Sequence, residues 1–248
     1  MVGVVSRPIL QDKYFLDPQA RFQFEHVIDQ ICDLPWEFLK NAELMRIAYM
    51  YYFFSIQFRE NLEIACQLYP NDRLLGTLYR EECNTATLSP WDRIAKPGER
   101  MNHDEFMRRL LLLEPVPELD QLRDVGATYL ENCRVLAPSI RAMSIGSYED
   151  QGLRKVFEAI LRAPTWHGLG QTAFKHFIAR HIEFDSDPDG GHGVLCQHLK
   201  PNDSILPLWI SFRDMLTAAA PGLRASSNSR DDGTSKLDWS LGSKIYSI

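Results

Sequence analysis

Carboxylate and imidazole side chains fall on the apolar faces of several predicted helices that are far apart in the sequence. The candidates are Glu82, His103, Glu149, His181, Asp185 and His192, with Glu81 as a further candidate. Such groups are costly to bury without partners. Their positions therefore predict a site in the protein interior that binds a cation.

The helical repeat is what places these side chains on buried faces. Residues at i, i+3, i+4 and i+7 share one face of a helix. A single inward histidine would be read as a hydrogen-bonded core residue, but one shared metal site explains the whole group. Four apolar stripes each include a metal-competent residue: Leu75, Leu78, Tyr79 and Glu82; His103, Phe106, Met107 and Leu110; Ile145, Glu149, Leu153, Val156 and Ile160; Phe174, Phe177, Ile178 and His181.

The types of these side chains narrow the choice of metal. Mixed carboxylate and imidazole sets suit iron, manganese or zinc. Three carboxylates and three histidines exceed what one ion usually requires, and helical bundles with inward Glu and His commonly carry paired iron. The five cysteines are isolated and form no C-x-x-C pair, which argues against thiolate zinc sites.

The elements that must position these residues are helices. Helical periodicity extends over nearly the whole sequence, and strand patterns are nearly absent. The aromatic cluster at 49–58 covers most of one helix, which we expect to be central and buried. Asn71 or Asp72 is expected to cap one helix, and Asn102 with Glu105 to form a capping box on another. The expected helices span 18–34, 36–69, 72–83, 102–113, 118–136, 138–162, 168–186, 192–199 and 203–218.

Composition sets limits on the class of protein. The chain of 248 residues is expected to form one all-helical domain over 1–220, followed by a polar tail over 221–248. A net charge of −6 without a Lys/Arg cluster argues against a nucleic-acid partner. The apolar stretch 47–56 is too short to span a membrane. An N-terminus unlike a signal peptide and unpaired cysteines favour a cytoplasmic location.

Three segments resemble the metal-binding regions of the haem-oxygenase-like dimetal oxidases. The segment 181–185, followed by Gly191-His192-Gly193, resembles the last metal-binding helix of that family. Residues 81–84 followed by 102–106 are similar to its first region, and 148–150 to its middle one. The resemblance covers roughly residues 60–200. It implies a seven-helix bundle that holds two Fe(II) ions and reacts with O2, with these ligands: Glu82, His103, Glu149, His181, Asp185 and His192.

The sequence departs from the family pattern at two places. A long loop with prolines separates Glu82 from His103, and an insertion over 186–191 breaks the late helix. We favour His192 as the last ligand because the glycines on both sides let the chain bend around it. Asp187, Asp189 and His198 compete for that position, and Glu81 competes with Glu82.

The finer resemblance concerns the substrate. Residues 81–85, 89–91 and 98–103 look most like the small amino-acid-oxidising members, such as the enzymes that form the azetidine of polyoxin and the nitrile of aetokthonotoxin. This implies oxidation of an unactivated C–H bond or an amine of a free amino acid, for example desaturation or C–N cyclisation, with an external reductant. Candidate partners for the substrate carboxylate are Arg80, Arg100, Arg108 and Arg180.

Other readings of the same residues stay open. A metal-free hydrolase of the thiaminase type on the same fold would need Cys83 or Cys196 as its nucleophile. A haem-degrading enzyme would use one axial histidine. A non-catalytic binding protein would keep the polar residues as a buried network. Pairing of two copies through helix faces is also an option for a small helical protein.

Overall fold

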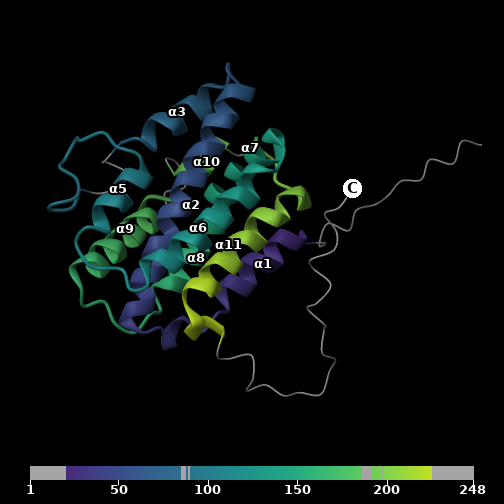
Figure 1. The fold of residues 1–248 in the computed structure, drawn as a ribbon. Helices are drawn as coiled ribbons and strands as arrows, with labels where there is room; N and C mark the ends of the chain where they lie inside the picture. The colour runs from purple at the N-terminus through teal and green to yellow at the C-terminus, as the bar shows by residue number, and fades with distance from the viewer. Residues whose placement is uncertain (1–20, 85–87, 89, 186–190, 197, 225–248) are drawn as a thin grey trace, which may run out of the picture.

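A long aromatic-rich helix runs through the middle of the protein. In this computed structural model, which describes residues 21–84, 88, 90–185, 191–196 and 198–224, α2 (Asn41–Leu68) packs against most of the other helices (Figure 1). The remaining helices are α1 (Gln23–Cys32), α3 (Arg73–Glu81), α5 (His103–Leu110), α6 (Leu119–Arg134), α7 (Pro138–Ser147), α8 (Leu153–Ile160), α9 (Leu169–Asp185), α10 (His192–Cys196) and α11 (Leu206–Ala219).

The prediction of an all-helical protein is confirmed for the described residues, which contain no strand. Short 3-10 turns at Trp36–Phe38, Asp203–Ile205 and Pro221–Arg224 complete the structure. The aromatic helix is central and buried, as its all-round apolar character predicts. It begins at Asn41 rather than 36, because the backbone is extended at Leu39 and Lys40.

The predicted continuous helix over 138–162 is wrong. A π turn, Tyr148–Gly152, separates α7 from α8, and Asp150 and Gln151 inside it leave helical geometry. Gln151 has φ of 69°, a left-handed conformation that side chains rarely adopt. Such π turns occur frequently at functional sites, and this one contains Glu149.

The predicted helix caps have different outcomes. Asp72 caps α3 as expected, and its carboxylate accepts hydrogen bonds from the backbone of Leu74 and Leu75 at 3.0 and 3.1 Å. The capping box on α5 is wrong. The Asn102 side chain instead accepts a hydrogen bond from the Cys83 thiol at 2.7 Å, which joins the two ends of the 84–101 loop.

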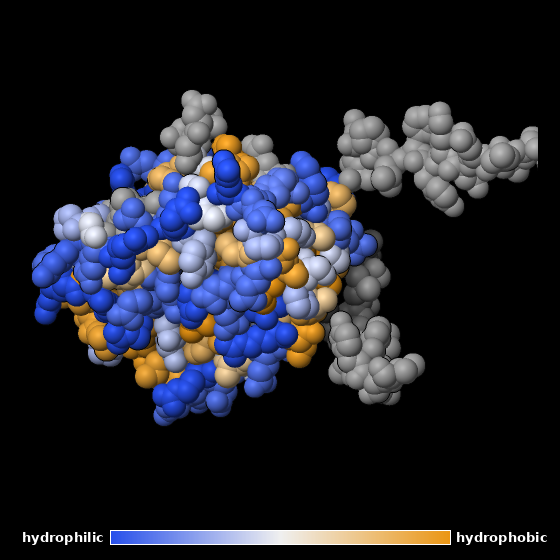
Figure 2. All heavy atoms as spheres, turned by 90° about the horizontal axis from the view of Figure 1, so that it is seen from above, coloured by the Kyte–Doolittle hydropathy of each residue, from blue (hydrophilic) through white to orange (hydrophobic). Residues whose placement is uncertain are grey.

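The surface and the end of the chain complete the picture. The face seen in Figure 2 is mostly hydrophilic, with hydrophobic residues scattered between polar ones. No helix in the described ranges combines the length and apolar character that crossing a bilayer needs. The packed body extends slightly past the expected boundary at 220, since Leu223 is buried and the Gly222 amide donates to Glu43 at 2.7 Å.

Candidate metal centre

The predicted ligands come from separate elements and line one cavity. Glu82 ends α3 and His103 begins α5, while His181 lies on α9. Glu149 lies in the π turn, and His192 begins α10. With Asp185 they surround a cavity of about 10 Å³, enough for one water-sized sphere. The remaining walls are mostly apolar, with the polar Tyr51 and Ser55 among them, so the candidate ligands face one another in a small enclosed space.

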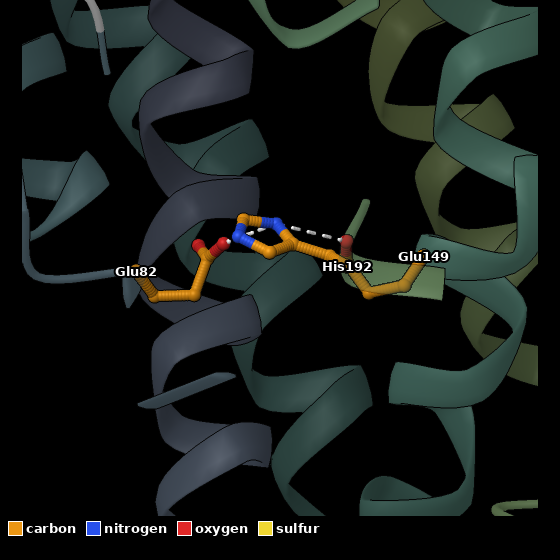
Figure 3. A group of neighbouring side chains, drawn as sticks. All are labelled: Glu82, Glu149 and His192. Atoms are coloured by element: carbon orange, nitrogen blue, oxygen red, sulfur yellow. Dashed lines mark ion pairs between the residues drawn. The ribbon is translucent and has the colours of Figure 1, made fainter. Parts of the chain in front are cut away.

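Three of these residues form the tightest group. Single ligand atoms of Glu82, Glu149 and His192 all lie within 4.8 Å of one another, and all three side chains are buried. His192 Nδ1 lies 2.9 Å from Glu82 Oε1 and 3.3 Å from Glu149 Oε2. Figure 3 shows the imidazole lying between the two carboxylates. Asp185 Oδ1 is slightly farther from His192 Nδ1, at 3.8 Å.

Two more histidines lie on the other side of Glu82. His103 Nδ1 is 3.0 Å from Glu82 Oε2, and the His103 and His181 rings are 4.8 Å apart. His181 Nδ1 lies 2.8 Å from the Phe177 carbonyl, so we assign the proton to Nδ1 and the lone pair to Nε2. A ring held in this way through one nitrogen is oriented to bind a metal through the other.

Several buried atoms at the site have no hydrogen-bond partner among the described residues. They include His103 Nε2, His181 Nε2 and Asp185 Oδ1. An unsatisfied buried polar group costs about 1–3 kcal/mol, and native proteins contain few of them. Here they cluster around one cavity and are all of types that ligate metals. Glu82 directs one oxygen toward His103 and the other toward His192, and the types and positions of these donors fit a metal site.

Burial and neighbouring charges shift the pKa values of several groups at the site. Burial raises the pKa of Glu149, and burial together with Glu149 raises the pKa of Asp185 to about 8. Burial lowers the pKa of His181 to about 3, so this imidazole is neutral at pH 7. Burial also disfavours charged His192, but Glu82 and Glu149 outweigh it and hold the pKa of His192 well above its usual value. A bound cation would replace the His192 proton as the charge that offsets the carboxylates.

Packing of α10 against the π turn fixes the position of His192. A Cβ atom on Gly193, in α10, would lie 3.1 Å from the Glu149 carbonyl. Glycine at this position allows the close approach. The sequence therefore brings His192 next to Glu149 although 43 positions separate them.

The alternative ligands are farther from the site or outside the described residues. Glu81 Oε2 lies 3.7 Å from His192 Nε2, at the more exposed edge of the cluster. His198 is at the surface, where its Nε2 lies 2.6 Å from Asp72 Oδ2. Asp189, like Asp187, lies outside the described residues.

The four arginines suggested as substrate partners are not brought to the cavity. All are exposed, and none of them lines it. These are Arg80, Arg100, Arg108 and Arg180. Arg80 donates a hydrogen bond to Thr77, Arg108 to Glu105 and Arg180 to Glu183. The arginine beside the site is Arg59, which sequence reasoning missed. It lines a second small cavity next to Glu82 and His103, and it donates to Asp104 and Glu63.

One wall of the metal cavity comes from α2. Tyr51, Phe54, Ser55 and Phe58 all face it. Their i, i+3, i+4 and i+7 spacing is visible in the sequence. The helix is apolar on nearly every side, however, so periodicity alone did not single out this face.

The two thiols proposed as nucleophiles are poorly suited to that role. Burial raises the pKa of both Cys83 and Cys196 above that of a free thiol. Cys83 donates to Asn102, and Cys196 lies 3.6 Å from the His192 and Gly193 carbonyls. Neither contact supplies a base, and a nucleophilic thiol requires the thiolate.

Comparisons with known proteins add no assignment. No protein-family model matches the chain, and no curated protein or solved structure matches it significantly. The resemblance to haem-oxygenase-like oxidases therefore stays a prediction, and functional inference rests on the site itself.

Proposed function

We propose that this protein is a non-haem dimetal oxidase or oxygenase that uses two Fe(II) ions and O2, built on a haem-oxygenase-like helical bundle. One observation carries the proposal: buried carboxylates and histidines from five segments meet around one cavity, and several of their metal-binding atoms have no hydrogen-bond partner among the described residues. A hydrogen-bonded polar network would have satisfied those atoms. A structural zinc site would need fewer ligands.

The residues divide into two groups that share Glu82. His103 and His181 would hold one ion, and Glu149, Asp185 and His192 would hold the other. When bound, the iron pair would supply the reducing electrons and the oxygen-activating chemistry. The chain keeps His181 neutral and oriented through Phe177, and its aromatic walls exclude water. Exclusion of water protects reactive species and strengthens electrostatic interactions in the site.

The proposed substrate is a small molecule, with a free amino acid as the first candidate. The metal cavity itself has no room for one, so the substrate must enter beside it. The adjoining cavity contains Arg59, whose guanidinium is a suitable partner for a carboxylate. This cavity is also only about 10 Å³, so a substrate could enter only if the surrounding side chains moved apart. Because Asp104 and Glu63 already bind this guanidinium, a substrate carboxylate would have to displace one of them. An external reductant would be needed for repeated turnover.

Anaerobic loading with Fe(II) tests the proposal. We expect about two ions per chain by elemental analysis, and an optical change when O2 is added that increases with one of the proteinogenic amino acids. His181→Ala should lose iron while keeping its helical circular dichroism. His198→Ala is the matched control, since it removes a histidine that lies at the surface. Unchanged iron binding by His181→Ala, or no binding by the parent, would refute the assignment.

A further inference from the structure

One hydroxyl in the wall of the cavity makes no hydrogen bond to any residue that the structure describes. Tyr51 lies on α2, is 3% exposed and shares the cavity with the candidate ligands. The Tyr51 backbone carbonyl accepts a hydrogen bond from the Ser55 hydroxyl at 2.9 Å. Aromatic rings surround the phenol, with centroids 5.3 to 5.9 Å away: Phe54, Phe157, Phe174 and Phe177.

Other buried tyrosines of this protein have partners. The hydroxyls of Tyr129 and Tyr148 donate to Gln57 Oε1 at 3.0 and 3.3 Å. Within the described part of the chain, no residue does the same for the Tyr51 hydroxyl. Buried polar groups are normally hydrogen-bonded, and an exception calls for a ligand or a function.

The Tyr51 hydroxyl is a hydrogen-bond donor at neutral pH. A free phenol has a pKa of about 10, so this group keeps its proton. Tyr51 shares its small cavity with Glu82, Glu149 and Asp185. Ser55, one turn further along α2, already donates to the backbone, so its oxygen can only accept.

The position of Tyr51 also indicates which side of the centre is open. The candidate ligands come from α3, α5, the π turn, α9 and α10, and none comes from α2. α8 also lines the cavity without a candidate ligand, but it contributes only the apolar Leu153 and Phe157. Of the two walls without ligands, α2 is therefore the one with polar side chains, and an exchangeable coordination position would lie on that side.

We propose that the Tyr51 hydroxyl donates a hydrogen bond to a small exchangeable ligand of the metal centre, such as water, hydroxide or another small anion, on the side facing α2. The inference rests on the proposed metal centre. It makes Tyr51 the residue that orients and selects this ligand. A donor held in a dry cavity favours anions, because hydrogen bonds to charged acceptors are the stronger ones.

Binding of azide to the Co(II)-loaded full chain tests the inference. The absorption of Co(II) reports both metal loading and the arrival of the anion. We expect Tyr51→Phe to bind Co(II) in the same amount as the parent but to bind azide about tenfold more weakly. Tyr129→Phe, which removes a buried hydroxyl outside the cavity, should leave azide binding unchanged.

The outcomes separate this inference from the proposed function. Equal azide affinity in Tyr51→Phe and the parent, or no azide binding by the Co(II)-loaded parent, overturns the role of Tyr51 and leaves the metal centre standing. Failure of the parent to bind Co(II) overturns both.

Stability of the metal-free protein gives a second, independent readout. Tyr51→Phe removes a hydroxyl that makes no hydrogen bond to the described residues, so the urea midpoint of this variant should equal or exceed that of the parent. Tyr129→Phe should lower the midpoint, because it breaks the bond to Gln57. An equal loss in both variants would mean that the Tyr51 hydroxyl already has a protein partner, which overturns the inference.

Discussion

Replacing Asp185 by asparagine should stabilise the metal-free protein while weakening its binding of metal. Asp185 Oδ1 is buried without a hydrogen bond from any described residue, and His192 Nδ1 lies 3.8 Å away. Burial and Glu149 raise the pKa of the carboxyl from 3.8 to about 8. Asparagine has the same shape but carries no charge that must be buried. A residue kept for structure alone would not show this trade-off.

The size of the gain follows from the shift in pKa. At about 1.36 kcal/mol per unit, a rise from 3.8 to about 8 corresponds to roughly 6 kcal/mol at pH 8. Relaxation and water entry reduce the penalty of a buried charge, so we expect a gain of about 1–3 kcal/mol. Because the folded pKa of Asp185 is raised, the metal-free parent loses this stability as the pH rises from 3.8 to 8. The gain from asparagine should therefore fall by about half at pH 5.5.

Urea unfolding of EDTA-treated protein at pH 8 and pH 5.5 measures the effect. Asp104→Asn is the matched control. Asp104 accepts hydrogen bonds from Arg59, so this substitution should lower the free energy of unfolding by about 1 kcal/mol. Under anaerobic Fe(II), the parent should become more stable than Asp185→Asn. If Asp185→Asn is less stable than the parent without metal at pH 8, the carboxylate is not held there for a cation.

The pH, the packing of α10 and the guanidinium beside the site each give a further test. Mn(II) should raise the melting temperature more at pH 8 than at pH 6.5. A metal displaces protons from His192 and Asp185, whose pKa values are raised, and protons compete less with the metal at higher pH. Gly193→Ala should weaken metal binding about tenfold with a native circular dichroism spectrum, since its Cβ would lie 3.1 Å from the Glu149 carbonyl; unchanged affinity would mean that this contact does not position Glu149. Arg59→Ala should raise KM for an amino-acid substrate by about tenfold or more with little change in iron content; the same change on removing an exposed arginine would count against a specific role.

Helical periodicity was sufficient to predict that some of the candidate ligands are buried. His103 and His181 were placed inward because each continues an apolar stripe, and both are buried. The arginine candidates were chosen by nearness in sequence, which is a different property. Adjacent helical residues point about 100° apart, so Arg180 is exposed although His181 is buried. Arg59 was missed because it lies far from the ligands in sequence and reaches the site through tertiary packing.

The helix break at Glu149 shows another limit of sequence patterns. The stripe from Ile145 to Ile160 keeps its helical spacing across the π turn, and no proline marks the interruption. Tertiary contacts fix the break instead, through the close approach of Gly152 to the Trp209 ring and of Gly193 to the Glu149 carbonyl. The predicted capping box at Asn102 is wrong for a similar reason. The Asn102 side chain accepts a hydrogen bond from the Cys83 thiol and does not cap α5.

The π turn makes the proposed centre sensitive to the deletion of a single residue. Deleting one residue at Asp150 or Gln151 would let α7 and α8 join in a regular helix and would rotate one relative to the other by about 100°. Glu149 would then no longer face His192, while the stripes on either side would need only to be repacked. A single codon would thus separate a metal-binding lineage from one that had lost the metal. Relatives on either side of such an event would have similar folds and different chemistry.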